Sequence, residues 1–214
     1  MTRHRHIYGC IPSPPDKRDE EYLLRAKRTA RQSRRWNLGP LRADQGNTPE
    51  CVGFATGHYL YATPIRQYLN PHGIYKGCKL IDGEPNEEGT YVRAAAKILK
   101  ASGFVDSYHW GRTVNSVVTT ILEVGPVIVG SDWYEGMEHG GLMEATGELL
   151  DGHAYLLFAA DRRTKRLEML NSWGRSWGDD GCAEMSFETL DVLLDGGEAM
   201  FAQEARPVAK WLMT

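Results

Sequence analysis

Long hydrophobic runs are absent from this sequence. No apolar segment reaches the roughly 20 residues that a membrane-spanning helix needs, and the first residues lack the uninterrupted apolar stretch of a secretory signal peptide. We therefore expect a cytoplasmic protein with no membrane partner.

Cysteine is scarce, and the few cysteines are widely separated. The chain has no CxxC pair of the kind that is typical of zinc sites and dithiol redox motifs. The sequence predicts four free thiols in a reducing compartment, and it gives no sign of a metal or an organic cofactor. The cysteines are Cys10, Cys51, Cys78 and Cys182.

A large net charge is also missing. The formal net charge of −3 argues against a surface dedicated to nucleic acid. Residues 1–35 nevertheless hold ten Lys or Arg against four Asp or Glu, an excess of six positive charges that leaves the remainder near −9. The sequence predicts a basic N-terminal arm on an acidic body. The arm is interpreted first as a solvated surface element and second as the docking site for a partner.

What the chain does contain is enough apolar material for one folded unit. It has 214 residues, of which 42% are hydrophobic, so it can bury a sizeable core. Residues 1–40 are assigned to the arm. Its prolines exclude a helix at residues 10–16, which should run extended over the surface, whereas residues 19–35 favour a solvated helix.

The first half of the body has a helical pattern. Thr48 can cap a helix, Pro49 suits the first helical position, and Cys51 then falls in the first turn. The following residues are apolar almost all round, which predicts a buried helix that ends near Pro64. Two further helices are expected at residues 88–99 and 116–123.

After Gly125 the pattern changes to short apolar runs separated by turn residues, which predicts strands. Residues 160–165 should form the loop of a hairpin. The fold class is therefore α+β, with one domain at residues 41–214. A helical half at about 41–124 precedes a β half at about 125–206.

Three residues in this arrangement carry nucleophilic chemistry. A thiol reacts as the thiolate, and a helix N-terminus and a nearby imidazole are the usual ways to stabilise it. Cys51 has the helix N-terminus, and His153 opens a strand that could supply the base. Asn171, at the end of the next strand, could fix the tautomer of that histidine.

The segments around these residues resemble the papain family of cysteine peptidases. Residues 44–55 resemble its active-site segment, with Gln45 standing six residues before Cys51 as in the family. Residues 152–154 are similar to its histidine strand, and residues 171–178, followed by Gly181, to its asparagine motif. The chain order Gln, Cys, His, Asn is also that of the family, and the resemblance covers about residues 41–187.

The resemblance implies a two-lobed fold and a reaction. Cys51 would attack a peptide carbonyl of a protein or peptide substrate, with Gln45 and the Cys51 backbone N–H forming the oxyanion hole. His153 would act as base and then as acid, and Asn171 would orient it. Trp173 occupies the position of the aromatic ring that shields the histidine–asparagine hydrogen bond.

The sequence departs from the family's secreted members at several positions. Val52 stands where they have tryptophan, Thr48 where they have a disulfide cysteine, and Cys182 where they have tyrosine. Those enzymes also begin with a long inhibitory prosegment, whereas only about forty residues precede the active-site segment here. One hypothesis is that this short arm blocks or orders the cleft.

Other interpretations stay open at this point. The same thioester could be transferred to an amine, as in transglutaminase-like enzymes, or the fold could serve as a binding or assembly module. Cys51 could also be a structural core cysteine. Cys10 on the arm, Cys78 in a loop and Cys182 on a strand are interpreted as bystanders, and His58 as a satisfied core or rim histidine.

Overall fold

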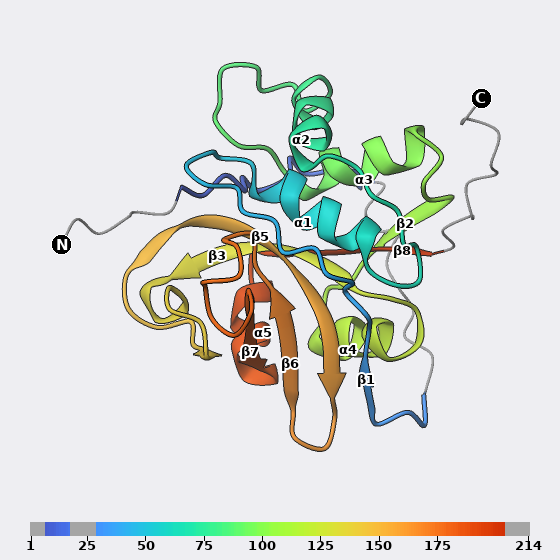
Figure 1. The fold of residues 1–214 in the computed structure, drawn as a ribbon, viewed down its shortest axis with the longest axis vertical. Coiled ribbons are helices and arrows are strands. Elements are labelled where there is room, and N and C mark those ends of the chain that lie inside the picture. The colour runs from blue at the N-terminus through green and yellow to red at the C-terminus, as the bar shows by residue number, and fades with distance from the viewer. Residues whose placement is uncertain (1–6, 18–28, 204–214) are drawn as a thin grey trace.

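Helices gather on one side of a twisted sheet in the computed structural model, which describes residues 7–17 and 29–203 (Figure 1). The three helices on that side are α1 (Cys51–Tyr61), α2 (Pro71–Lys79) and α3 (Val92–Ala101). This is the α+β class that the sequence predicts, with helices ahead of most strands. Within the two described segments, no helix is both long enough and apolar enough to cross a membrane.

The sheet has eight strands in the order β2-β8-β3-β5-β6-β7-β4, and β1 also pairs with β5. All pairs are antiparallel except β4 with β7. The strands are β1 (Ser33–Arg35), β2 (Ser107–Trp110), β3 (Val127–Tyr134), β4 (Leu142–Met143), β5 (Leu149–Asp161), β6 (Arg166–Leu170), β7 (Cys182–Ser186) and β8 (Glu198–Gln203). The strands predicted after Gly125 are confirmed, as is the hairpin between β5 and β6.

β5 separates two hydrophobic cores. Successive side chains on a strand point to opposite faces, so Leu156 and Phe158 join a core with the α1 residues. Tyr155 and Leu157 join a second core that includes side chains of α4 (Val114–Glu123) and α5 (Phe187–Leu194). This two-sided burial explains why residues 153–160 have an uninterrupted buried run in place of an alternating one.

α1 is buried on every side, as the sequence predicts. All its residues from Cys51 to Leu60 are buried, and it packs against β5. The predicted helix start is wrong by two residues, because the helix begins at Cys51 and has no side-chain cap. The Thr48 hydroxyl instead donates to the carbonyl oxygen of Gln45, with the oxygens 2.7 Å apart.

Other boundaries differ where tertiary contacts override local pattern. The helix expected at residues 88–99 begins only at Val92, because Gly89 has φ 85° and Thr90 bridges to Cys10. α4 agrees with its prediction and has a capping box between Thr113 and Ser116. Cys78, expected in a loop, is buried in α2. No sequence pattern predicted α2, α5, β1, β2, β4 or β8, nor the 3-10 turn η2 (Glu135–Met137).

The N-terminal arm runs over the surface only in part, with Pro12, Pro14 and Pro15 exposed. Residues 10–16 are not helical, in agreement with their prolines, but Cys10 is buried and bridges to Thr90. Most of the helix predicted at residues 19–35 lies outside the described residues, and its last three residues form β1. The described part of the arm is therefore integrated into the fold at two places.

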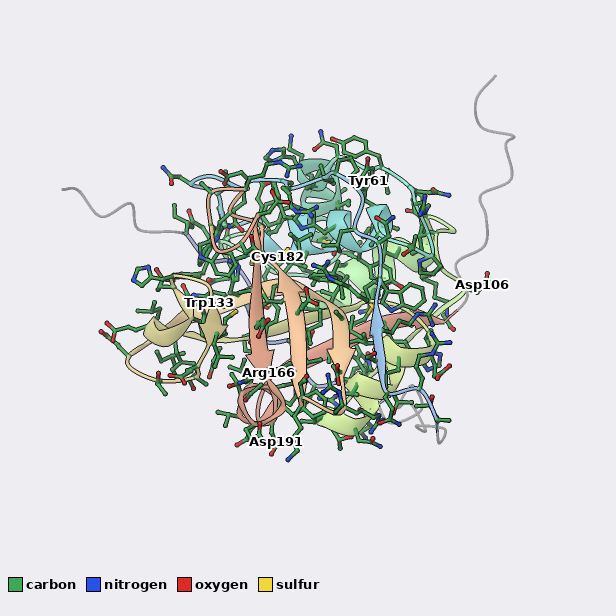
Figure 2. The ribbon with its side chains drawn as sticks, turned by 60° about the horizontal axis from the view of Figure 1, so that its bottom comes forward. Tyr61, Asp106, Trp133, Arg166, Cys182 and Asp191 are labelled. Atoms are coloured by element: carbon green, nitrogen blue, oxygen red, sulfur yellow. The ribbon has the colours of Figure 1, made fainter. Side chains whose placement is uncertain are left out.

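Figures 1 and 2 both show the same end of the sheet facing the helices. Figure 2 shows Cys182 at the helix-facing end of the sheet and Arg166 toward the opposite end. Cys182 pairs with Leu170, so Asn171, the next residue after β6, is placed at the helix-facing end. The fold thereby brings the N-terminus of α1 and the end of β6 to one region.

Candidate active site

Cys51 is the first residue of α1 and is completely buried. Burial raises the pKa of its thiol to about 12, while backbone hydrogen bonds from Ala154, Val52 and Gly9 act in the opposite direction. Ala154 follows His153 on β5, so the sulfur lies beside the histidine strand. With the arm in place, burial outweighs the helix N-terminus, and the thiol is the stable form at neutral pH.

The fold brings His153 and Asn171 together. β5 and β6 are antiparallel neighbours, and His153 Nε2 lies 2.7 Å from Asn171 Oδ1. Because an amide oxygen only accepts hydrogen bonds, Nε2 carries the proton. The neutral ring then keeps its lone pair on Nδ1, which is the tautomer that a general base at Nδ1 requires.

Aromatic rings surround this pair. The Trp173 ring centroid lies 4.9 Å from that of His153, and the Trp133 centroid lies 4.7 Å from it. Trp133 is fully buried, and Trp173 is 3% exposed. These rings limit the access of water to the histidine–asparagine hydrogen bond, which strengthens it electrostatically.

Gln45 is held in one orientation by three hydrogen bonds. Its Oε1 accepts from the Ser172 hydroxyl at 2.5 Å, and its Nε2 donates to the carbonyl oxygens of Thr48 at 2.7 Å and Ile7 at 2.8 Å. Because the carbonyl oxygens of Thr48 and Ile7 can only accept, the amide nitrogen must face them, and the Ser172 hydroxyl then donates to the oxygen end. The result is a preformed donor for a main-chain carbonyl oxygen.

The arm segment, residues 7–11, lies across this site as an extended peptide. The N–H groups of Gly9 and Cys10 donate to the Gly152 carbonyl oxygen at 3.3 and 3.1 Å. On the opposite wall, the Ile11 N–H donates to the Thr90 oxygen at 3.0 Å, and the Thr90 N–H to the Gly9 oxygen at 2.9 Å. The segment is therefore bound through its backbone to both walls.

Two glycines make this close approach possible. A Cβ atom at Gly9 would lie 2.1 Å from the Pro49 carbonyl oxygen, and one at Gly152 would lie 2.0 Å from the Cys10 carbonyl oxygen. Real Cβ atoms do not approach backbone oxygens so closely, so larger residues at these positions would displace the segment. Cys10 is accordingly a buried neighbour of the site.

His58 lies within the same framework. It is buried, and its Nε2 accepts a hydrogen bond from the Ala43 N–H at 3.1 Å. Burial and, to a smaller extent, the positive charge of Arg42 lower the pKa of His58 to about 3. The ring is therefore neutral, and it fixes the chain two residues before Gln45.

Several contributors to the site were not found from the sequence. Ser172 lies inside the predicted asparagine motif but has no local signal for contacting Gln45. Thr90 and Gly152 act through backbone atoms, which no residue type indicates. Among the residues that the structure describes, no group of three or more His, Cys, Asp or Glu could bind a metal ion.

Comparison with known proteins gives matches at the level of structure. No family model matches the sequence, and no curated protein matches it. Xylellain, a cysteine protease from Xylella fastidiosa, matches with a TM-score of 0.73 and 16% identity, over 95% of this chain and 99% of that chain. Digestive procathepsin L 3 of Tenebrio molitor larval midgut matches with a TM-score of 0.67 and 18% identity, over 94% and 76%.

A plant enzyme gives a similar result. The bromelain protease from Ananas comosus, in complex with the E64 inhibitor, matches with a TM-score of 0.61 and 14% identity, over 80% of this chain and 98% of that chain. At identities this low, the similarity concerns the fold alone. This chain has the papain-like fold of the cysteine proteases that it matches.

Proposed function

We propose that this protein is a cysteine peptidase with Cys51 as nucleophile, and that the arm segment covers its cleft in the state described here. The observation that carries the proposal is the hydrogen bond from Gln45 Nε2 to the Ile7 carbonyl oxygen, beside the N-terminus of α1. A site that already binds an extended peptide by its backbone and holds one of its carbonyl groups has the geometry for acyl chemistry.

The proposed reaction uses each group in a defined role. The Cys51 sulfur attacks the carbonyl carbon of a substrate, and its proton passes to His153. The oxyanion accepts hydrogen bonds from Gln45 Nε2 and the Cys51 N–H. His153 then donates the proton to the leaving amine as the C–N bond breaks, and water hydrolyses the thioester to regenerate the thiol.

Asn171 and Trp173 act through His153 in this proposal. The hydrogen bond of 2.7 Å to Asn171 holds the ring and its tautomer, and the Trp173 ring covers that hydrogen bond. This is the arrangement by which a third group orients the base of a nucleophile–base pair. Their removal should therefore lower the rate while leaving the thiol present.

The arm must leave before a substrate can enter. Residues 7–11 take the Gln45, Gly152 and Thr90 hydrogen bonds that an incoming peptide would need. We therefore expect low activity in the covered state, and activation by any event that removes the arm segment from the cleft.

The test uses the full chain with Gly9→Val, which cannot seat the arm segment against Pro49. Incubated with an unfolded protein substrate, it should produce new peptide ends, and Gly9→Val combined with Cys51→Ala should produce none. An added amine tests the competing transferase reaction. If amine-modified products dominate over cleavage, the protein is a transferase, and if neither forms, the fold serves binding.

A further inference from the structure

The cleft beside Cys51 has strongly acidic walls. It has a volume of about 980 Å³, and the arm segment, Pro49, Leu150 and His139 contribute to its lining. Its remaining lining residues are Glu88, Glu135, Glu138, Glu148 and Asp151. None of the described lining residues is Lys or Arg, so these five carboxylates, the acidic wall, face the cleft without a cation among them.

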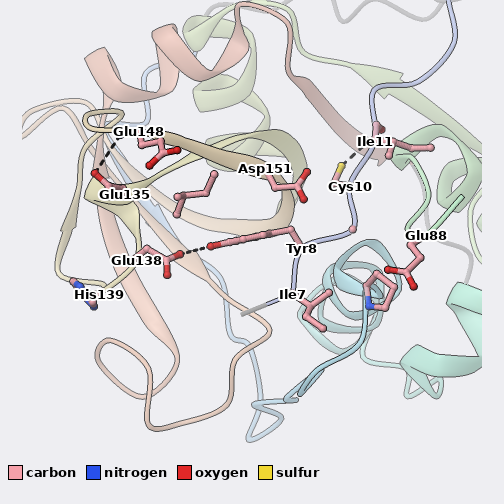
Figure 3. Close-up of a pocket in the computed structure, with 13 residues that line it drawn as sticks. Ile7, Tyr8, Cys10, Ile11, Glu88, Glu135, Glu138, His139, Glu148 and Asp151 are labelled. Carbon is pink, nitrogen blue, oxygen red and sulfur yellow. Dashed lines mark hydrogen bonds between the residues drawn. The ribbon is translucent and has the colours of Figure 1, made fainter. Parts of the chain in front are cut away.

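One part of this cleft already holds a side chain. The Tyr8 hydroxyl donates to Glu138 Oε1 at 2.6 Å, and the Tyr8 ring meets the rings of His153 and Trp173 edge-on, with centroids 5.8 and 6.0 Å away. Figure 3 shows Tyr8 pointing toward Glu138, with Glu135 and Glu148 on the same side. We call the space that the Tyr8 side chain fills the Tyr8 pocket. It adjoins the candidate base, His153, and ends at the Glu138 carboxylate.

Glu138 is fixed in this position by two tryptophans. Trp133 Nε1 donates to Glu138 Oε1 at 2.8 Å, and Trp177 Nε1 donates to the Glu138 carbonyl oxygen at 2.7 Å. Trp133 is fully buried and Trp177 is 7% exposed. Because both the side chain and the backbone of Glu138 are held, the carboxylate is preorganised to receive a donor.

We propose that, once the arm has left, the Tyr8 pocket binds a lysine or arginine side chain of the substrate, and that Glu138 determines this specificity. The proposal rests on the proposed peptidase function and names its substrate class. Lys and Arg are about as long as Tyr, and they bring a positive charge and several donors to a carboxylate whose present donors, the Tyr8 hydroxyl and the Trp133 N–H, are both neutral.

The surrounding charges decide between a basic and a neutral occupant. Tyr8 satisfies a hydrogen bond but brings no positive charge to Glu138 or to the neighbouring Glu135 and Glu148. A cationic side chain gains from all three, whereas an acidic one is repelled by all three. The arm segment thus fills the pocket with Tyr8, which forms a hydrogen bond but no ion pair with Glu138. A neutral occupant is easier for a cationic substrate side chain to displace.

The test measures peptide binding separately from catalysis. The full chain carrying Gly9→Val and Cys51→Ala is titrated into dye-labelled peptides that are identical except for Arg, Tyr or Glu at one position, scanned along the peptide. At the peptide position whose side chain enters the Tyr8 pocket, the Arg peptide should bind about tenfold more tightly than the Tyr peptide and about 100-fold more tightly than the Glu peptide. Adding Glu138→Gln should reduce the Arg-over-Tyr preference to about twofold or less.

Glu144→Gln is the matched control, because Glu144 is an exposed acid of the same loop that does not line the cleft. It should leave the Arg preference unchanged. The inference is overturned if Tyr binds as tightly as Arg at every position, or if Glu138→Gln and Glu144→Gln have equal effects. If Gly9→Val with Cys51 intact cleaves no peptide while the Arg preference holds, the peptidase function is refuted and the binding pocket stands.

Discussion

Gln45 donates a hydrogen bond to the carbonyl oxygen of Ile7, with Nε2 and O 2.8 Å apart. Gln45 is the residue that the sequence assigns to the oxyanion hole, and Ile7 belongs to the basic arm. The chain's own backbone therefore occupies the place that the proposed reaction gives to a substrate carbonyl. This contact connects the candidate chemistry with the segment that covers it.

Displacing the arm segment should increase activity. Gly9→Val places methyl groups where even a Cβ atom would lie 2.1 Å from the Pro49 carbonyl oxygen, so the segment cannot bind both walls. We expect hydrolysis of an unfolded protein to rise about tenfold or more over wild type, which would correspond to about 1.4 kcal/mol or more between the covered and open states. Pro12→Ala, at an exposed position of the same arm, should change the rate little.

The reactivity of Cys51 in the wild-type chain should depend steeply on pH. Its pKa of about 12 is raised by burial, so thiolate is lost as the pH falls below that value. Alkylation, followed by mass mapping of Cys51, should therefore accelerate about tenfold per pH unit between pH 7 and 10. A rate that is flat across this range would show that Cys51 is already ionised under the arm.

Ser172 should act on the rate through Gln45. Ser172→Ala removes the donor to Gln45 Oε1, which leaves the amide free to turn its oxygen toward the oxyanion. In the Gly9→Val background we expect kcat to fall about tenfold with little change in KM, against about 100-fold for Gln45→Ala. If Ser172→Ala instead lowers thermal stability and the loss of kcat follows from that loss of folded protein, the hydroxyl has a purely structural role.

His58 should make stability depend on pH. Its pKa is lowered to about 3 in the folded state, against an ordinary value near 6.5, so below pH 6.5 the unfolded chain binds a proton that the folded chain does not. Stability should therefore fall as the pH decreases, by on the order of 2 kcal/mol between pH 7 and 5. Urea unfolding measures this, and His58→Gln, which keeps an acceptor for Ala43, should remove most of this part of the slope.

The sequence predicted the elements that carry the candidate site better than the contacts by which residues 7–11 cover that site. Cys51 begins α1, His153 lies within β5, and Asn171 directly follows β6. These elements have strong patterns, so helix and strand signals suffice to place the three residues. The seating of residues 7–11 depends on contacts with Gly152 and Thr90, which are remote in the sequence. Local pattern cannot report such contacts.

The missed elements have physical reasons of their own. α2 is short and largely exposed, with only Pro71, Ile74 and Cys78 buried, so its apolar stripe is narrow. Glu138 lies just after the turn η2 and is held by Trp133 and Trp177, whose side chains reach it only in the folded state. Its role in the cleft follows from the fold and from no motif.

The most direct test of the central claim is intact-mass labelling with a limiting epoxide or iodoacetamide at neutral pH. Wild type is compared with Gly9→Val, with Gly9→Val/His153→Ala and with Gly9→Val/Cys51→Ala. We predict slow labelling of wild type and one rapid adduct on Cys51 in Gly9→Val, which slows greatly without His153 and disappears without Cys51. If Gly9→Val labels all four cysteines at similar slow rates, or labels Cys51 equally fast without His153, the proposed nucleophile–base pair is contradicted.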